Sequence, residues 1–240
     1  MIAAERHKKV SLQQSSLEQG IFLRSEDILT SHAFGLLRYL PHELGFGLLL
    51  RALSLPQEGP VSVTFWCLEA GTEPDILLET PSCVVLVEVK LHAAFSEGQL
   101  AREWQYLVRR APEKRRLLVT LLPSAIAPSD IVAQIVERLP VSQHDALPTL
   151  SEVSCLTWSE LGRIVLLRDG VGDAHIRAVR EDFEYVLTSR GLFGRFEHWP
   201  ATYPSIPRYQ TWYQAGWFKQ HVPDASTRNV WRTSPSFMKE

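Results

Sequence analysis

Apolar residues recur at two different spacings along this chain, and each change of spacing marks a new element. After Ser25, apolar residues return every three or four positions as far as Leu40, and Pro41 follows directly. This spacing predicts a helix of about four turns that ends before the proline. A second apolar piece, residues 48–53, precedes the proline-bounded loop 56–60.

Three short runs rich in β-branched and aromatic residues come next, separated by turn residues. They cover residues 61–69, 74–80 and 84–90, and their composition predicts strands. Residues 97–110 then return to helical spacing, and residues 116–122 are almost wholly apolar, as in a buried strand. The order helix, three strands, helix, strand predicts an α/β core.

The pattern beyond this core is mainly helical. It predicts a helix over 129–139, a loop over 140–148, a short strand leading into a helix from 153, and a helix over 174–190 that Gly191 ends. The last fifty residues have frequent prolines and little periodicity. We therefore expect a core in residues 1–125, an α/β to helical extension packed on it in 126–190, and a separate C-terminal segment in 191–240.

Composition narrows the class of protein. The chain of 240 residues is 45% hydrophobic and 22% charged with a net charge of -2, which is typical of a folded globular protein. Its cysteines, Cys67, Cys83 and Cys155, form no metal-ligating spacing and favour a reducing compartment. The polar opening residues 1–10 and the lack of a long apolar stretch predict a cytoplasmic protein without a membrane contact.

The second and third predicted strands bring charged residues together. If their turn is the pair Pro81-Ser82, opposed residues have numbers that sum to 163, so Asp75 faces Glu88. Lys90 follows Glu88 by two residues and projects from the same face. The opposite face is then wholly apolar, as a core-facing surface requires.

Two directly opposed carboxylates destabilise each other unless something compensates their charge. Mg²⁺ prefers one or two carboxylates together with waters and phosphate oxygens, so Asp75 and Glu88 are suited to hold it against a scissile phosphate. Lys90 would then orient the attacking water or neutralise the charge that develops in the transition state.

These residues resemble the signature of the PD-(D/E)XK, or restriction-endonuclease-like, nuclease superfamily. The similarity lies in Pro74-Asp75, twelve further residues and Glu88-Val89-Lys90, within residues 20–125. It implies an αβββαβ core with a mixed central sheet and a Mg²⁺- or Mn²⁺-dependent nuclease. By the same resemblance Asp75, Glu88 and the Val89 backbone carbonyl bind the metal, and Lys90 assists the attacking water.

The resemblance also suggests two further site residues. Family members often add a metal-binding acid from the first helix. Glu26 is the preferred candidate, because it lies on the helix face that carries Leu29, whereas Asp27 points about 100° away. A role in the helix dipole is the alternative for Glu26. The family's QxxxY pattern is absent at its usual spacing, but Gln99 begins the following helix and is the preferred polar contact, with Gln105 and Tyr106 as weaker choices.

The C-terminal segment is basic and rich in aromatic residues. Residues 191–240 hold six Lys or Arg and three Asp or Glu, a net charge of +3. Its aromatic residues, among them Trp199, Trp212 and Trp217, are interleaved with arginines and lysines. Such a segment can stack bases and hold phosphates, or pack on the core, a second copy or a partner subunit.

The leading hypothesis is a nuclease that acts on nucleic acid, with DNA as the expected substrate, in phage defence or genome maintenance. A second hypothesis is a noncatalytic subunit that uses the same fold to bind nucleic acid or protein. A third is a structural α/β protein in which the motif is coincidental. Metal-dependent cleavage separates the first hypothesis from the other two.

Overall fold

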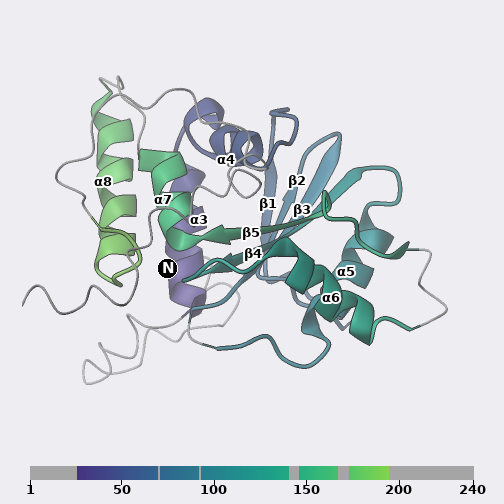
Figure 1. Cartoon of the computed structure of the whole chain (residues 1–240). Coiled ribbons are helices and arrows are strands. Elements are labelled where there is room, and N and C mark those ends of the chain that lie inside the picture. The colour runs from purple at the N-terminus through teal and green to yellow at the C-terminus, as the bar shows by residue number, and fades with distance from the viewer. Residues whose placement is uncertain (1–25, 70, 92, 141–145, 167–172, 195–240) are drawn as a thin grey trace, which may run out of the picture. The chain divides into compact units, whose positions relative to one another are not determined.

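The computed structural model describes residues 26–69, 71–91, 93–140, 146–166 and 173–194. The chain divides into two compact units, Met1–Trp199 and Pro200–Glu240, and every described residue belongs to the first. These residues form an α/β unit built on a five-stranded mixed sheet (Figure 1). No helix within them is long and apolar enough to cross a membrane.

The elements follow one another in the predicted order, with one short addition. The helices are α3 (Glu26–Leu37), η2 (His42–Leu44), α4 (Phe46–Ala52), α5 (Gln99–Arg110), α6 (Pro128–Arg138), α7 (Trp158–Leu166) and α8 (Ala174–Thr188). The strands are β1 (Ser62–Phe65), β2 (Ile76–Glu79), β3 (Cys83–Val89), β4 (Arg115–Leu122) and β5 (Val153–Thr157). The short helix α4 covers most of the apolar piece 48–53, and η2 lies between it and α3.

The strands lie in the sheet in their order along the chain. β1, β2 and β3 form an antiparallel meander, whereas β3, β4 and β5 are parallel to one another. The two parallel steps are made by crossovers that contain α5 and α6, as parallel neighbours require. The carboxyl ends of β3 and β4 therefore reach the same edge of the sheet.

The predicted hairpin register is confirmed. β2 and β3 pair as Ile76 with Val87, Leu77 with Leu86, and Leu78 with Val85, so opposed residue numbers sum to 163. The Thr80 N–H donates to the Cys83 carbonyl across the two-residue turn at 2.9 Å. Every side chain of these strands therefore lies on the predicted face.

The two faces of the sheet carry different cores. Leu77, Val84, Leu86 and Leu118 are buried on the face covered by α5 and α6, where Trp104 packs among them. The opposite face presents apolar residues, among them Ile76, Leu78, Val85, Val87 and Val89. Figure 1 shows α3, α7 and α8 on that side, so the sheet is the middle of three layers.

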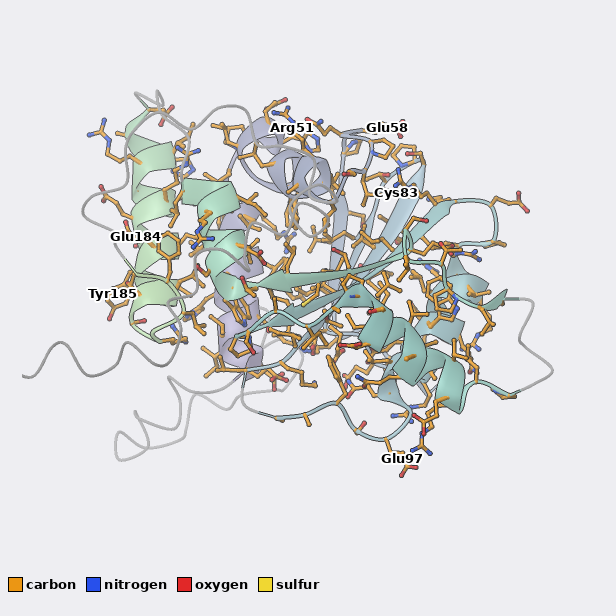
Figure 2. All side chains as sticks on the ribbon, viewed as in Figure 1. Arg51, Glu58, Cys83, Glu97, Glu184 and Tyr185 are labelled. Carbon is orange, nitrogen blue, oxygen red and sulfur yellow. The ribbon has the colours of Figure 1, made fainter. Side chains whose placement is uncertain are left out.

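Side chains fill both spaces between the sheet and its helices (Figure 2). The outer face of α8 is solvated, and Tyr185 projects from it with 68% of its surface exposed. Its inner face is apolar, with Phe183 and Leu187 fully buried. This amphipathic pattern explains why α8 packs one face against α3 and α7 and exposes the other.

Three differences from the predicted elements concern where two elements begin or end and how far the sheet extends. β1 ends at Phe65 because Trp66 takes a left-handed backbone conformation with φ of 45°. α5 begins at Gln99 because Gly98, with φ of 67°, turns the chain into the helix. The strand β5, assigned to the extension, pairs with β4 and so belongs to the same sheet as the core.

Candidate functional site

Five predicted site residues come from the ends of four elements. Asp75 directly precedes β2, Glu88 lies near the end of β3, and Lys90 follows that strand. Gln99 begins α5 and Glu26 begins α3. Because β3 lies between β2 and β4 in the sheet and α5 packs over it, the ends of these elements meet at one edge of the sheet.

Asp75 is held by two donors. Its Oδ2 accepts a hydrogen bond from the Val89 backbone N–H at 2.8 Å, and its Oδ1 accepts one from the Trp66 indole Nε1–H at 3.2 Å. The left-handed backbone of Trp66 directs this indole toward the start of β2, and the Trp66 N–H also donates to the Asp75 carbonyl at 3.2 Å. Such a conformation is costly for a residue other than glycine and persists only where its surroundings fix it.

Glu88 is the most buried of the predicted site residues, with 2% of its side chain exposed. The hairpin register, continued by one pair beyond Ile76 and Val87, opposes it to Asp75. Glu88 Oε1 accepts hydrogen bonds from Lys90 Nζ at 2.6 Å and from Gln99 Nε2. One carboxylate oxygen thus receives a cation and an amide.

Lys90 connects Glu88 with the first helix. Its Nζ lies 3.4 Å from Glu26 Oε1, and 13% of its side chain is exposed. Glu26 Oε2 accepts a hydrogen bond from the Leu91 backbone N–H at 2.7 Å. Glu26 is therefore fixed to the segment after β3 by both oxygens, as its place on the inward face of α3 predicted.

The orientation of the Gln99 amide follows from its neighbours. Its Oε1 accepts a hydrogen bond from the Ser96 N–H at 3.0 Å, and from the Ser96 hydroxyl at 3.3 Å. An N–H donor requires the carbonyl end of the amide, so the NH₂ end points to Glu88. Ser96 thus selects the amide rotamer that donates to the carboxylate.

One acid in contact with the site was not predicted. Glu103 of α5 is 3% exposed and interacts with the side chains of Glu88 and Gln99 at hydrogen-bonding range. It lies one helical turn after Gln99, between the buried Leu100 and Leu107. A charged residue within an otherwise apolar stripe is the sequence signal that identifies it.

Burial and the charge of a neighbouring carboxylate oppose ionisation of Asp75 and of Glu88. Burial, followed by the charge of Glu88, raises the pKa of Asp75 to about 8, although the Val89 N–H and Lys90 act in the opposite direction. Burial and the charge of Glu103 raise the pKa of Glu88 to about 8, against the effect of Lys90. The site therefore carries more negative charge than its own donors stabilise.

The same surroundings affect the pKa values of Lys90 and Glu103 differently. Burial alone would lower the pKa of Lys90, but the carboxylates of Glu88, Glu26 and Asp75 raise it on balance, so the ammonium stays charged. Burial raises the pKa of Glu103 to about 7, while hydrogen bonds from Glu88 and Gln99 lower it. The surplus of acid over base is what a cation would neutralise.

The residues present fit a divalent cation through a pair of carboxylates. Within the described ranges no group of three or more His, Cys, Asp or Glu side chains is arranged to hold a metal ion. Mg²⁺ needs only one or two protein carboxylates, because waters and phosphate oxygens supply the remaining ligands. Asp75 and Glu88 are such a pair, and both offer the hard oxygen ligands that Mg²⁺ and Mn²⁺ prefer.

The Val89 carbonyl lies on the same side of β3 as Asp75. The Lys90 N–H donates to the Leu121 carbonyl of β4 at 2.9 Å, so the backbone groups of the preceding residue point to the other side, toward β2. The Val89 N–H is already held there by Asp75. A metal-ligand role for the carbonyl stays a prediction.

The weaker predicted contacts lie elsewhere or outside the described residues. The Tyr106 hydroxyl donates to Glu69 Oε2 at 3.1 Å, and this bond fixes α5 to the chain after β1 instead of serving the carboxylates. The aromatic and basic segment from residue 195 onward falls outside the described residues, as do the predicted nucleic-acid or partner contacts that depend on it.

No model of a protein family, no curated protein and no solved structure matches this chain. The chemistry of the site is therefore argued from its own residues.

Proposed function

We propose that the chain is a Mg²⁺- or Mn²⁺-dependent nuclease of the PD-(D/E)XK type, with a restriction-endonuclease-like core, that hydrolyses phosphodiester bonds of nucleic acid. DNA is the substrate we expect first. A setting in phage defence or genome maintenance, in the cytoplasm, is part of the same proposal and follows from the resemblance alone.

The observation that carries the proposal is the opposition of two acids at a sheet edge with a lysine in contact. Asp75 and Glu88 face each other in the hairpin register, and Lys90 Nζ lies 2.6 Å from Glu88 Oε1. Burial raises the pKa of both acids to about 8, so neither is stabilised as a carboxylate by the protein alone. Perturbed acids of this kind mark functional sites more often than structural ones.

The surrounding chain supports the same proposal. A helix, three strands, a helix and a fourth strand follow in the order that the resemblance implies, with η2 and α4 as the insertion. Glu26 and Gln99, the two additions implied by the resemblance, contact Lys90 and Glu88 respectively. A coincidental motif would not be expected to gather all five residues.

Each side chain has a distinct part in the proposed reaction. Asp75, Glu88 and the Val89 carbonyl would hold the cation, which when bound polarises the phosphate and lowers the pKa of a water molecule. Lys90 stays protonated between Glu88 and Glu26, so it donates hydrogen bonds to the attacking water or to a phosphate oxygen. Because it keeps its proton, Lys90 stabilises developing negative charge instead of acting as a base.

The test is incubation of the purified full chain with supercoiled plasmid, single-stranded DNA and single-stranded RNA. Each substrate is combined with Mg²⁺, Mn²⁺ or EDTA. We expect cleavage of at least one DNA substrate with Mg²⁺ or Mn²⁺ and none with EDTA. Comparison of the three substrates then defines the preferred nucleic acid.

Two outcomes would contradict the proposal. Cleavage that persists at the same rate in EDTA would mean that the carboxylate pair is not a cation site. Binding of nucleic acid without cleavage in either cation would point instead to a noncatalytic subunit with the same fold.

A further inference from the structure

The loop between β3 and α5 is fixed against the candidate site at two points. The ring centroid of Phe95 lies 5.9 Å from Lys90 Nζ, and Phe95 also packs against the buried core under α5. Ser96, the next residue, donates its N–H and its hydroxyl to the Gln99 amide oxygen. Any side chain held by this loop therefore has a defined position beside the site.

Arg102 of α5 is such a side chain. Long side chains of a helix lean toward its N-terminus, and Arg102 reaches back over the loop. Its Nη1 donates to the Glu97 carbonyl at 2.9 Å, and its Nη2 donates to the Ser96 hydroxyl at 3.4 Å. A Cβ atom on Gly98 would lie only 3.3 Å from Nη1, so the glycine leaves room for the guanidinium.

The charge of Arg102 is not neutralised by a carboxylate in the described part of the chain. Its two hydrogen bonds go to a carbonyl and a hydroxyl oxygen, which carry no net charge. By contrast, Arg110 pairs with Glu79 at 3.2 Å, and Arg138 pairs with the carboxylate of Glu97, labelled in Figure 2, at 2.8 Å. A guanidinium has five N–H donors, so those that remain can bind an anion.

The site itself does not attract a phosphodiester. Four acids surround one base, namely Glu26, Asp75, Glu88 and Glu103 around Lys90. Their net charge is -3 when all are ionised, and it is still -1 with one divalent cation bound. A nucleic acid therefore needs positive charge from outside this group, and Arg102 supplies it next to the site.

We infer that Arg102 is a substrate-binding residue, which holds a backbone phosphate beside the phosphodiester that is cleaved. A planar guanidinium can donate two parallel hydrogen bonds to one phosphate. Because Glu97 and Ser96 already fix the guanidinium, little side-chain entropy is lost on binding. A phosphate contact positions the strand without selecting a base. The inference rests on the proposed function, since nucleic acid is the substrate proposed there.

The experiment separates substrate binding from the chemical step. Initial rates of cleavage in Mn²⁺ are measured for the wild type, Arg102→Gln and Arg109→Gln on supercoiled plasmid or single-stranded DNA, whichever the wild type cleaves faster. Arg109 is the matched control, because it is an exposed arginine two turns further along the same face of α5. We expect Arg102→Gln to raise KM by about 10-fold or more, with kcat changed by less than about 2-fold. Arg109→Gln should change neither constant.

The dependence on salt tests for the phosphate contact itself. The logarithm of kcat/KM should fall linearly with the logarithm of the KCl concentration, with a slope set by the number of phosphates that the protein neutralises. Arg102→Gln should make this slope shallower by about 0.9 on duplex DNA or about 0.7 on single-stranded DNA. A role confined to the shape of the loop would leave the slope unchanged.

The outcomes distinguish this inference from the proposed function. Unchanged KM and salt slope in Arg102→Gln would overturn the inference alone. Equal changes in Arg109→Gln would do the same, because the general charge of α5 would then be responsible. A lower kcat together with weaker Mn²⁺ binding would show that Arg102 only supports the fold of the site. No cleavage by the wild type contradicts the proposed function, and the inference with it.

A second variant separates charge from hydrogen-bond geometry. Arg102→Lys keeps the charge but lacks the planar fork, and circular dichroism verifies the fold of both Arg102 variants. We expect its KM to lie between those of the wild type and Arg102→Gln, with the salt slope of the wild type, because lysine still neutralises one phosphate. A KM as high as that of Arg102→Gln, with an equally shallow slope, is incompatible with a phosphate contact at this position.

Discussion

Lys90 Nζ lies 2.6 Å from Glu88 Oε1, and the two residues are separated by a single position of the chain. Alternate residues of a strand project from the same face, so this contact is set by backbone geometry and needs no distant element. A lysine so close to a carboxylate lowers the affinity of that carboxylate for any cation. In the proposed reaction Lys90 therefore acts on the transition state and not on cation binding.

Replacement of Lys90 by methionine should separate cation binding from catalysis. We expect Lys90→Met to bind Mn²⁺ more tightly, because a positive charge beside Glu88 is lost. Cleavage should fall by about 100-fold or more, as when a donor to developing negative charge is removed. Titration with Mn²⁺ and an initial-rate assay measure the two effects. A parallel loss of binding and cleavage would show that Lys90 only supports the fold of the site.

The stability of the metal-free protein should decrease as the pH rises from 6.5 to 8.5. The pKa values of Asp75 and Glu88 are about 8 in the folded protein, above the value of about 4 in an unfolded chain. Between these values the folded state binds more protons, so the free energy of unfolding falls with rising pH. Burial lowers the pKa of His32 to about 4, below the value of 6.5 in an unfolded chain. This residue makes the free energy of unfolding rise with pH, but only between these two values, below the range tested.

Thermal unfolding in EDTA measures this slope. Glu88→Gln should flatten it, because one of the responsible acids is removed, whereas the surface variant Glu137→Gln should not. Saturating Mn²⁺ should raise the unfolding temperature more at pH 8.5 than at pH 6.5. A wild-type stability that is level or rises over this range would contradict the electrostatic account.

The indole of Trp66 should affect cation affinity through Asp75. Trp66→Phe removes the Nε1–H that donates to Asp75 Oδ1 at 3.2 Å. We expect Mn²⁺ affinity to fall about 10-fold, the lower end of the range for a lost partner of a metal ligand. Trp158→Phe is the matched control, because Trp158 is also buried but its Nε1 has no hydrogen-bond partner among the described residues. Equal losses of Mn²⁺ affinity in both variants would show that the effect comes from packing and not from the hydrogen bond to Asp75.

Glu26 should stabilise the chain after β3 through its hydrogen bond as well as its charge. Glu26→Ala leaves the Leu91 N–H, now bonded at 2.7 Å, without an acceptor, which costs about 1–3 kcal/mol. Glu26→Gln keeps an acceptor and should retain most of that stability. Urea unfolding in EDTA compares the two variants. The surface variant Glu137→Ala controls for loss of an acid from a helix, and a loss of stability equal to that of Glu26→Ala would contradict the role of Glu26.

Local rules were sufficient to predict the hairpin and its charged residues. A two-residue turn fixes the register, and the alternation of Val85, Val87 and Val89 with Glu88 fixes which side chains share a face of the sheet. Helical periodicity likewise favoured Glu26 over Asp27, and Glu26 Oε2 accepts a hydrogen bond from the Leu91 N–H. These relationships depend on a few adjacent residues.

The features that were missed depend on the packing of distant elements. Trp66 reaches Asp75 through a left-handed conformation that its own sequence does not favour. Glu103 lies within the apolar stripe of α5, and an acid in that stripe acquires a role only when the helix lies over Glu88. The pairing of β5 with β4 similarly required knowledge of the whole sheet.

The initial rate of plasmid cleavage by Asp75→Asn in Mn²⁺, relative to the wild type and to Glu137→Gln, tests the central claim most directly. Asn keeps the shape of Asp75, and its oxygen can still accept one of the two hydrogen bonds, but the charge that holds the cation is lost. We predict that Glu137→Gln cleaves as the wild type does and that Asp75→Asn is slower by at least about 100-fold. Cleavage by Asp75→Asn at the wild-type rate would contradict the account.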